Sequence, residues 1–376
     1  MRNVEKIRKE FPITRNKTFL NHSAMSPLPE PVANVIHKCV DEISASGETS
    51  IEWNDGGKPL FARIIHAESE EIALVENTSI GLNVVANMLT YPRGSKIVTT
   101  DLEYPSVVYP WLRKRLHTSI DYVKNIDGKI LLNDLDAAVD DNTVAIVISH
   151  VEYMNGFRQD LRAMSEIAHE HGAYLVVDAI QSAGVLEIDV ERDNVDFLAS
   201  ACYKWLLSPP GAAYLYVKKQ LIKDFEPPLA GWASVKPEVF ETLDFWDIWS
   251  LRLSETASRF EVGSPSLISF VGATEALRML LSYGIENIER RVLKLTDHLI
   301  EALKKQGLAL QTPEDTQHRS GIVNYKIKNP QEAVQKLNSR GIIVSARAHG
   351  VRASPHFYNT EEEIDYLVNE TKKIAR

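Results

Sequence analysis

Residues 174–217 read YLVVDAIQSAGVLEIDVERDNVDFLASACYKWLLSPPGAAYLYV and decide the fold. Three apolar runs, at 175–177, 195–199 and 212–217, have the length and β-branched composition of buried strands. Asp178 ends the first run, and Lys204 follows the second run after Tyr203. The stretch therefore places an acid, Asp178, and an amine, Lys204, after two successive strands that are rich in apolar residues.

The same alternation extends toward the N-terminus. After an irregular segment at 19–30 and a helix at 32–43, strands are expected at 71–76, 96–100, 120–123 and 144–149. Helices are expected after Asn77 and at 106–116, 132–139 and 161–170. Strands that alternate with helices predict an α/β fold with a mainly parallel sheet covered on both faces.

A second, smaller domain is expected after this region. A chain of 376 residues exceeds one ordinary core. Helices at 267–283 and 285–305, strands at 322–327 and 342–345 and a last helix at 361–373 indicate a small α+β domain. We place the large domain at 15–255 and form the small domain from 1–14 and 256–376.

Composition excludes several functions. A net charge of −9 and a pI near 5.7 argue against nucleic-acid binding. No apolar run reaches the ~18 residues of a membrane span, and the first residues lack an apolar signal core, so we expect a cytoplasmic protein. Cys39 and Cys202 are too few for a disulfide framework or a cysteine zinc site, and His169 and His171 are spaced to face different sides of a helix.

Other cofactor motifs are missing. The sequence has no GxGxxG after a strand, no GxxxxGK[ST] and no GxSxG. The remaining chemistry lies at the strand ends, where ligands bind in open parallel sheets. Thr78 and Ser79 start a helix whose N–H groups suit a phosphate, Asp178 suits a ring nitrogen, and Lys204 suits an imine. Together these groups predict pyridoxal 5′-phosphate as the cofactor.

The runs VVDAIQSAG and VDFLASACYKWLLSPPGAAYLYV resemble the class V aminotransferase group of fold-type I pyridoxal phosphate enzymes. That group includes cysteine desulfurases, isopenicillin N epimerase-like proteins and kynureninases. The resemblance extends from FLNHSAMSPLP near the start to VRASPHFYNTEEEID near the end. It implies a fold-type I enzyme that forms a homodimer with the active site at the interface.

The resemblance also implies roles for individual residues. Lys204 would carry the Schiff base, Asp178 would pair with the pyridinium nitrogen, and Gln181 would lie near the phenolic oxygen. Tyr104, in LEYPS, would stack on the ring, although packing at the surface explains it as well. The implied phosphate ligands are Thr78, Ser79, Tyr203, Trp232 and Ser264, the last of these from the partner subunit.

Substrate recognition is assigned in the same way. Arg352 matches the arginine that holds the substrate carboxylate, with Arg347 as the alternative. Asn21 and His22 belong to the front segment that lines the substrate pocket in relatives, although a structural histidine explains His22 as well. Trp232 is likewise explained by simple packing.

Departures from the family pattern bear on the reaction. Cysteine desulfurases need a mobile cysteine near the C-terminal arginine, and no cysteine follows Cys202. Tyr203 stands in place of a histidine, Ala201 in place of a serine, and Tyr153 in place of an asparagine. These changes disfavour a desulfurase that works through a protein persulfide.

The predicted function is a pyridoxal phosphate enzyme acting on an amino acid or amine, with transamination as the first choice. A lyase of kynureninase or carbon–sulfur type is the second. An epimerase is the third, with Tyr104 as the only candidate for a second acid or base. An α/β ligand-binding protein without a covalent cofactor is the non-enzymatic alternative. Side-chain specificity is expected to reside in the irregular segments 19–30 and 228–265.

Overall fold

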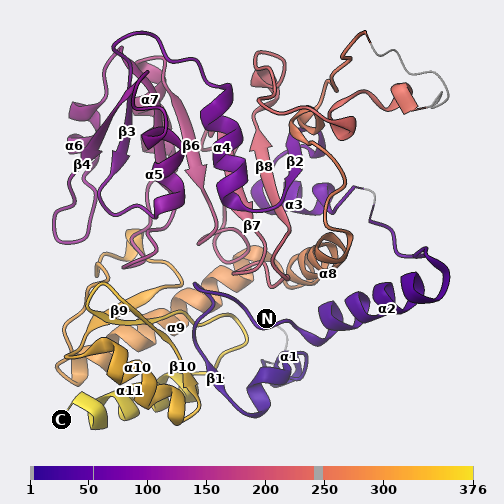
Figure 1. Cartoon of the computed structure of the whole chain (residues 1–376). Helices are drawn as coiled ribbons and strands as arrows, with labels where there is room; N and C mark the ends of the chain where they lie inside the picture. Colours follow the sequence, from indigo (N-terminus) through magenta and orange to yellow (C-terminus); the bar gives the residue numbers. More distant parts are fainter. Residues whose placement is uncertain (1–3, 54, 241–248, 376) are drawn as a thin grey trace.

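The computed structural model describes residues 4–53, 55–240 and 249–375. A large α/β domain holds the central sheet, and a smaller α+β layer lies beside it, below the sheet in Figure 1. Of the irregular segment 228–265, the Phe- and Trp-containing part at 241–248 lies outside the described residues. No helix in the described ranges has the length and apolar character to cross a bilayer.

The central sheet has seven strands in the order β2-β8-β7-β6-β5-β3-β4. All neighbouring pairs are parallel except those made by β8, which runs against β2 and β7. The predicted mainly parallel α/β sheet is therefore confirmed. In sheet order, the strands are β2 (Ile72–Val75), β8 (Ala213–Val217), β7 (Phe197–Ala201), β6 (Tyr174–Asp178), β5 (Thr143–Ser149), β3 (Lys96–Thr100) and β4 (Ser119–Val123).

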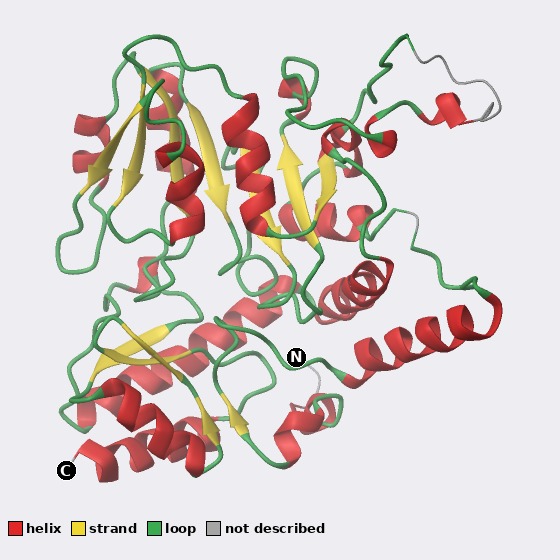
Figure 2. Ribbon diagram, in the orientation of Figure 1, coloured by secondary structure: helices red, strands yellow, loops and turns green. Residues whose placement is uncertain are grey.

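Helices cover both faces of this sheet, as Figure 2 shows. Alternate residues of each strand point to opposite faces, and the two faces carry separate apolar clusters. On one face pack α4 (Thr78–Met88) and α5 (Pro105–Leu112). On the other pack α3 (Lys58–Ile65), α6 (Leu132–Ala138), α7 (Leu161–Glu170) and α8 (Leu267–Tyr283).

Most expected elements form within a residue or two of the predicted bounds, and two differ in a way that matters. Strand β7 begins at Phe197 rather than 195 and extends to Ala201, close to Lys204. The carboxylate of the preceding Asp196 accepts the N–H of Leu175 on the neighbouring strand at 2.8 Å. Helix α5 ends at Leu112, four residues before the expected end, in a segment where Pro110 removes a backbone donor.

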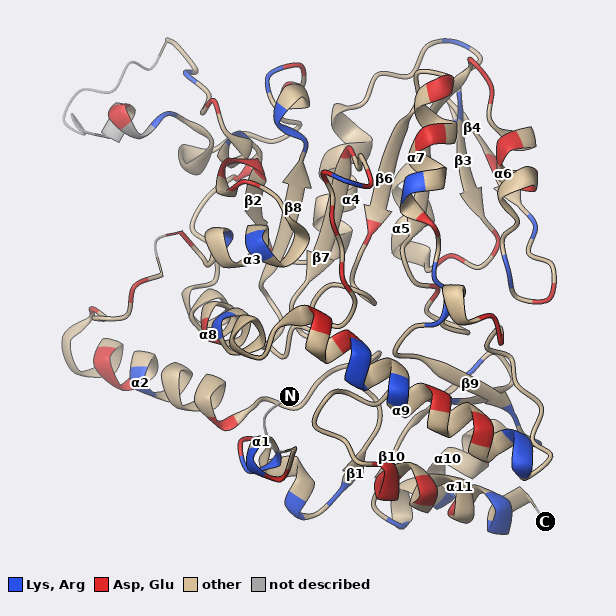
Figure 3. Cartoon of the chain, turned by 180° about the vertical axis from the view of Figure 1, so that it is seen from behind, with Lys and Arg blue, Asp and Glu red and all other residues tan. Residues whose placement is uncertain are grey.

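The small domain has a three-stranded antiparallel sheet, in the order β11-β12-β9. Its strands are β9 (Val323–Lys326), β11 (Ser345–Arg347) and β12 (Gly350–Ala353), and the last of these was not expected from the sequence. Helices α9 (Ile285–Lys305), α10 (Pro330–Ser339) and α11 (Glu361–Ala375) complete the domain. Both signs of charge occur along α9 in Figure 3, on the side away from the apolar residues it buries.

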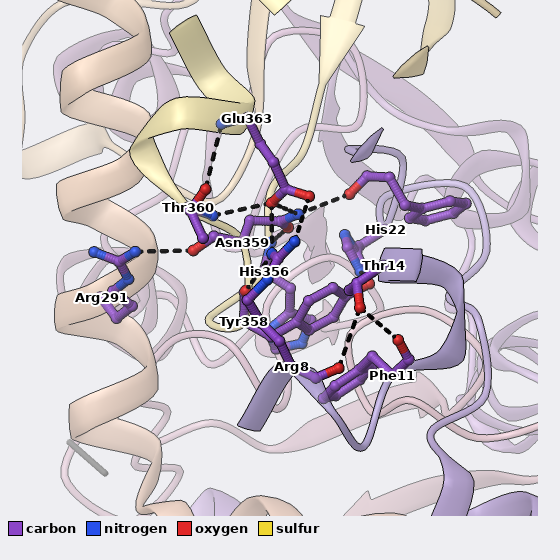
Figure 4. Close-up of polar contacts among 11 residues, drawn as sticks. Arg8, Phe11, Thr14, His22, Arg291, His356, Tyr358, Asn359, Thr360 and Glu363 are labelled. Carbon is purple, nitrogen blue, oxygen red and sulfur yellow. Dashed lines mark hydrogen bonds and ion pairs between the residues drawn. The ribbon is translucent and has the colours of Figure 1, made fainter. Parts of the chain in front are cut away.

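The N-terminal segment packs against the C-terminal part of the chain. Strand β1 (Thr18–Phe19) pairs in parallel with β10 (Ile342–Ile343). Arg8, at the end of α1 (Val4–Arg8), makes two hydrogen bonds to the Glu363 carboxylate at 2.8 and 3.1 Å (Figure 4). Helix α2 (Glu30–Ser46) follows this segment and packs against α8. The domain boundary near residue 255 stays a prediction.

Candidate active site

A pocket lies at the carboxyl ends of the parallel strands, where such sheets bind ligands. Seven of the twelve site residues predicted from the sequence line it, and these seven come from four separate segments of the chain. The lining residues are Asn77, Thr78, Ser79, Tyr104, Ser106, Ser149, Tyr153, Asp178, Ile180, Gln181, Tyr203 and Lys204.

One end of the pocket is built from two helix starts. Thr78 and Ser79 are the first residues of α4, so their N–H groups have no acceptor within the helix. The hydroxyl of Ser79 lies 2.7 Å from that of Ser106, in the first turn of α5. Thr78 Oγ1 also accepts the N–H of Ala201 at 2.9 Å, which ties this end to β7. Free N–H groups, hydroxyls and a positive helix end suit a phosphate.

Asp178 lies at the end of β6 and is buried. Its Oδ1 accepts the N–H of Ile180 at 2.8 Å, whereas Oδ2 has no hydrogen bond to the described residues. Burial raises the pKa of this carboxyl to about 6, and the Ile180 N–H and Lys204 oppose the rise. Asp178 therefore presents one open carboxylate oxygen to the pocket.

Lys204 follows β7 and lines the same pocket without forming an ion pair with Asp178. The pKa of its ammonium is lowered to about 8, mainly by burial and also by Arg352 and Arg347, while Asp178 acts in the opposite direction. A larger neutral fraction at neutral pH is what a nucleophilic or proton-transferring lysine needs.

Three tyrosines surround the lysine. Lys204 Nζ lies 5.9 Å from the ring centre of Tyr104 and 5.8 Å from that of Tyr203. Tyr104 and Tyr153 meet edge to face, with their ring centres 5.1 Å apart. Tyr104 is 47% exposed, so one face of its ring remains open for stacking.

Gln181 is held in place by its own hydrogen bonds. Its Oε1 accepts the indole N–H of Trp205 at 3.0 Å, and its Nε2 donates to the carbonyl of Ser23 at 3.0 Å. One amide hydrogen is left for a ligand in the pocket. The amide also links the front segment of the chain to the residues around Lys204.

Arg352 does not line this pocket but lies beside it, on β12. It is 2% exposed, and its Nη1 donates to the carbonyl of pocket residue Tyr153 at 2.6 Å. Its Nε donates to Ser345 Oγ at 3.3 Å, and no carboxylate of the described residues pairs with it. Its pKa is lowered to about 9, mainly by burial and in addition by the nearby Arg347. A buried cation without an acid partner is a ready site for an anionic ligand.

His22 does not line the pocket, and its buried ring has a structural role. Figure 4 shows its ring among the aromatic residues near the two chain ends. Its Nδ1 lies 2.8 Å from the Ser354 carbonyl, so Nδ1 donates, and its Nε2 accepts from the Tyr358 hydroxyl at 2.8 Å. Burial holds the pKa of this fully buried imidazole well below its ordinary value.

Its neighbour Asn21 is placed differently. Asn21 forms a bridge with Ser354, two residues after Arg352. Its Oδ1 is buried and has no hydrogen-bond partner among the described residues. A substrate role for Asn21 therefore stays a proposal.

Trp232 and Ser264 are not part of the pocket in a single chain. Trp232 is 58% exposed, and Ser264 is exposed as well. The two residues lie near each other. Gly263, which directly precedes Ser264, is so close to Trp232 that a Cβ added to it would be 3.5 Å from the indole nitrogen. A phosphate-binding role for either side chain stays a prediction.

Sequence reasoning missed the serine and acid residues around the pocket. Ser106 follows Pro105 at the start of α5, a signal of the same kind that identified Thr78. Ser149 directly opposes Asp178 in the sheet, and it donates its N–H and hydroxyl to Glu103 at 2.7 and 2.6 Å. Burial raises the pKa of Glu103 to about 8.

The residues present fit pyridoxal phosphate. The open Oδ2 of Asp178 suits the ring nitrogen, the start of α4 suits the phosphate, and Lys204 lies on the pocket wall between aromatic rings. No group of three or more metal-binding side chains occurs among residues 4–53, 55–240 and 249–375.

Comparison with known proteins agrees with this geometry. The family model described as "Aminotransferase class-V" matches residues 19–367. The chain belongs to the class-V aminotransferase family. The fold-type I architecture, the pyridoxal phosphate cofactor and the enzymatic character expected from the resemblance are thereby confirmed, and the non-enzymatic alternative is set aside.

Individual members of the family carry different names. An uncharacterized aminotransferase, YcbU, of Bacillus subtilis is 31% identical over 369 residues, covering 97% of this chain and 96% of its own. A probable cysteine desulfurase of Pyrococcus abyssi is 28% identical and covers 100% of this chain and 98% of its own. The apo structure of a cysteine desulfurase from Thermococcus onnurineus superimposes with a TM-score of 0.88 at 28% identity, over 100% of this chain and 98% of its own.

Proposed function

We propose that this class-V enzyme is an aminotransferase that acts on an amino acid. One observation supports this most: Lys204, Asp178 and the start of α4 line a single pocket, and the unpaired Arg352 lies beside it. The first three bind and activate the cofactor, and the arginine binds the carboxylate of an amino acid by paired hydrogen bonds.

Each residue has a distinct task. Bound pyridoxal phosphate supplies an aldehyde for covalent attachment and a ring that accepts electrons when a bond at Cα breaks. Asp178 would keep a proton on the ring nitrogen, and the N–H groups of Thr78 and Ser79 would hold the phosphate. Lys204 Nζ, with its lowered pKa, would take the proton from the substrate Cα and deliver it to the cofactor carbon that carries the nitrogen, as aminotransfer requires. Tyr104 would stack on the cofactor ring and exclude water from it.

The two cysteines argue against a protein persulfide. Cys39 and Cys202 are both fully buried and free. Burial raises the pKa of the Cys202 thiol above its ordinary value, which opposes formation of the nucleophilic thiolate. Neither residue lines the pocket. A desulfurase that transfers sulfur to its own cysteine is therefore disfavoured.

A lyase that releases its leaving group into solution is the second candidate. It is favoured by the names of two relatives, the probable cysteine desulfurase of Pyrococcus abyssi and the cysteine desulfurase of Thermococcus onnurineus. Such a reaction uses the same lysine and the same electron-accepting ring, and it needs no cysteine of the protein.

A homodimer is part of the proposal. Exposed apolar side chains accompany Ser264 on the segment that holds Trp232, among them Leu229, Leu251 and Val262. A partner chain that covers this surface brings Ser264 to the phosphate end of the other pocket. Light scattering should give twice the mass of the chain, and Ser264→Ala should weaken cofactor binding without changing that mass. We also place the enzyme in the cytoplasm, in keeping with its free cysteines; cell fractionation tests this.

An amino-donor panel tests the reaction. The holoenzyme is incubated with single amino acids and a 2-oxo acid acceptor, and the new amino acid, ammonia and sulfide are measured in the same samples. Aminotransfer without ammonia or sulfide supports the proposal. Stoichiometric release of ammonia or sulfide would instead identify the lyase.

A further inference from the structure

Three strands of the small domain bring polar residues into one row. Arg352 on β12 is directly opposite Ser345 on β11 and Asn324 on β9. Directly opposed residues of an antiparallel sheet point to the same face. Arg347 is two residues from Ser345 on β11, so its side chain shares that face as a diagonal neighbour of Arg352.

Neither arginine has an acid partner in the described part of the chain. Arg347 Nη1 donates only to the carbonyl of Ala346, at 2.7 Å, and Arg352 donates to Ser345 and to the carbonyl of Tyr153. Two neighbouring cations repel each other, and one of them is buried, so the pair costs free energy in the unliganded protein. An anion between them would remove that cost.

The shared face is directed at the active site. Arg352 Nη1 binds the carbonyl of Tyr153, which lines the pocket with Lys204. Asn324 Nδ2 donates to the carbonyl of the next residue, Met154, at 2.7 Å and to the carbonyl of Arg347 at 3.1 Å. One buried amide thus joins the strand of Arg347 to the pocket wall.

The turn after Arg347 limits where its side chain can go. Ala348 and His349 connect β11 to β12 with φ values of 47° and 63°. Two residues with positive φ form the tight hairpin turn that keeps its flanking residues paired. Arg347 is paired with Gly350 across this hairpin, and its exposed side chain lies at the rim of the site.

We propose that the substrate is an amino acid with a second carboxylate in its side chain. Arg352 binds the α-carboxylate in the buried position, and Arg347 binds the side-chain carboxylate at the rim. Diagonal neighbours lie about 7–8 Å apart, with a somewhat shorter Cβ separation, and over this span two long arginines can hold both carboxylates of a short dicarboxylic amino acid. This assignment rests on the proposed function, because it assumes an amino acid substrate.

Binding without catalysis is the first test. Calorimetry measures the affinity of the holoenzyme for two dicarboxylates, succinate and glutarate, and for the matched monocarboxylates butyrate and valerate. We expect the dicarboxylates to bind about 10-fold more tightly, the effect of one added charge-assisted contact at an exposed arginine. Arg347→Gln should abolish the difference and leave monocarboxylate binding unchanged. Arg162→Gln, on the exposed face of α7, is the matched control and should change nothing.

Turnover is the second test. Values of kcat/KM for aspartate and glutamate are compared with those for asparagine and glutamine, and Arg347→Gln should remove a preference for the acids. Equal affinities for the two carboxylate classes, or an equal loss of both in Arg347→Gln, would overturn the inference. Aminotransfer from neutral donors only would also overturn it, while leaving the aminotransferase proposal intact. Selective dicarboxylate binding without any aminotransfer would refute the aminotransferase and retain the two-arginine site.

Discussion

Asn324→Ala tests whether one buried amide holds the small-domain face to which we assign substrate binding against the pocket. Asn324 is fully buried, and its side chain makes three hydrogen bonds. Two of them donate to carbonyls on different segments, those of Met154 and Arg347, and the third accepts from Gln311 at 3.0 Å. Alanine removes all three and leaves both carbonyls without these donors.

The expected loss follows from these contacts. A buried hydrogen bond contributes about 1 kcal/mol net, so three of them amount to about 3 kcal/mol for the local opening of this sheet. That free energy corresponds to an increase of about 100-fold in hydrogen exchange of the protected amides. Because the hairpin carries Arg352, the looser sheet should also raise KM for the amino donor about 10-fold, with a smaller effect on kcat.

Hydrogen exchange followed by mass spectrometry measures the first effect, peptide by peptide. Faster exchange should appear in β9, β11, β12 and the segment around Met154, while β6 and β7 keep their protection. Asn142→Ala is the control, because Asn142 is exposed and its side chain makes no hydrogen bond to the described residues. Unchanged exchange in the small sheet, or a rise in KM of the same size in the control, would show that Asn324 does not act as the link.

Three further predictions concern the pocket and the core. Lys204→Ala should keep the circular dichroism spectrum of the native fold but prevent borohydride from fixing the cofactor to the chain; labelling of another lysine would contradict the assignment. Arg352→Gln should raise KM for the amino donor by about 10- to 100-fold, because it removes a charge-assisted carboxylate contact, and amines without a carboxylate should react as before. Acid should destabilise the fold between about pH 6.5 and pH 4. Burial lowers the pKa of His356 to about 4 in the folded state. In that window the imidazole is protonated in the unfolded state but not in the folded state, so the free energy of unfolding falls as the pH falls. The pKa of His22 is shifted in the same direction. Thermal melting across this range measures the effect, and a flat profile would refute it.

The residues that follow strands could be predicted from the sequence. Asp178 and Lys204 come after apolar runs, and the carboxyl ends of parallel strands meet at one edge of the sheet. Thr78 was found by the same reasoning, since a helix starts there directly after a strand. For these positions, local pattern and sheet topology together determine the location of the side chain. The structure accordingly brings them to one pocket.

Positions that depend on long-range pairing could not be predicted in this way. The row of Ser345, Arg352 and Asn324 exists only because β12 pairs with both β9 and β11, and no periodicity in 350–353 indicated a strand. His22 is placed by hydrogen bonds to residues more than 300 positions away in the chain. Its pocket role was inferred from its segment, but its partners in the folded chain determine where the ring lies.

In the proposed site, chemistry and specificity are assigned to different parts of the fold. The residues assigned to the cofactor lie on the large sheet and its helices, whereas Arg347 and Arg352, which pair with no acid of the described residues, lie on the small sheet. Substitutions of the first set should change kcat for every substrate, because we assign Lys204 to the proton at Cα and Asp178 to the ring nitrogen, whatever the side chain of the substrate is. Substitutions of the second set should change KM and the order of preferred substrates, because they alter only the cations that face the carboxylates. Asn324, which bonds to both segments, is the position at which the two effects should appear together.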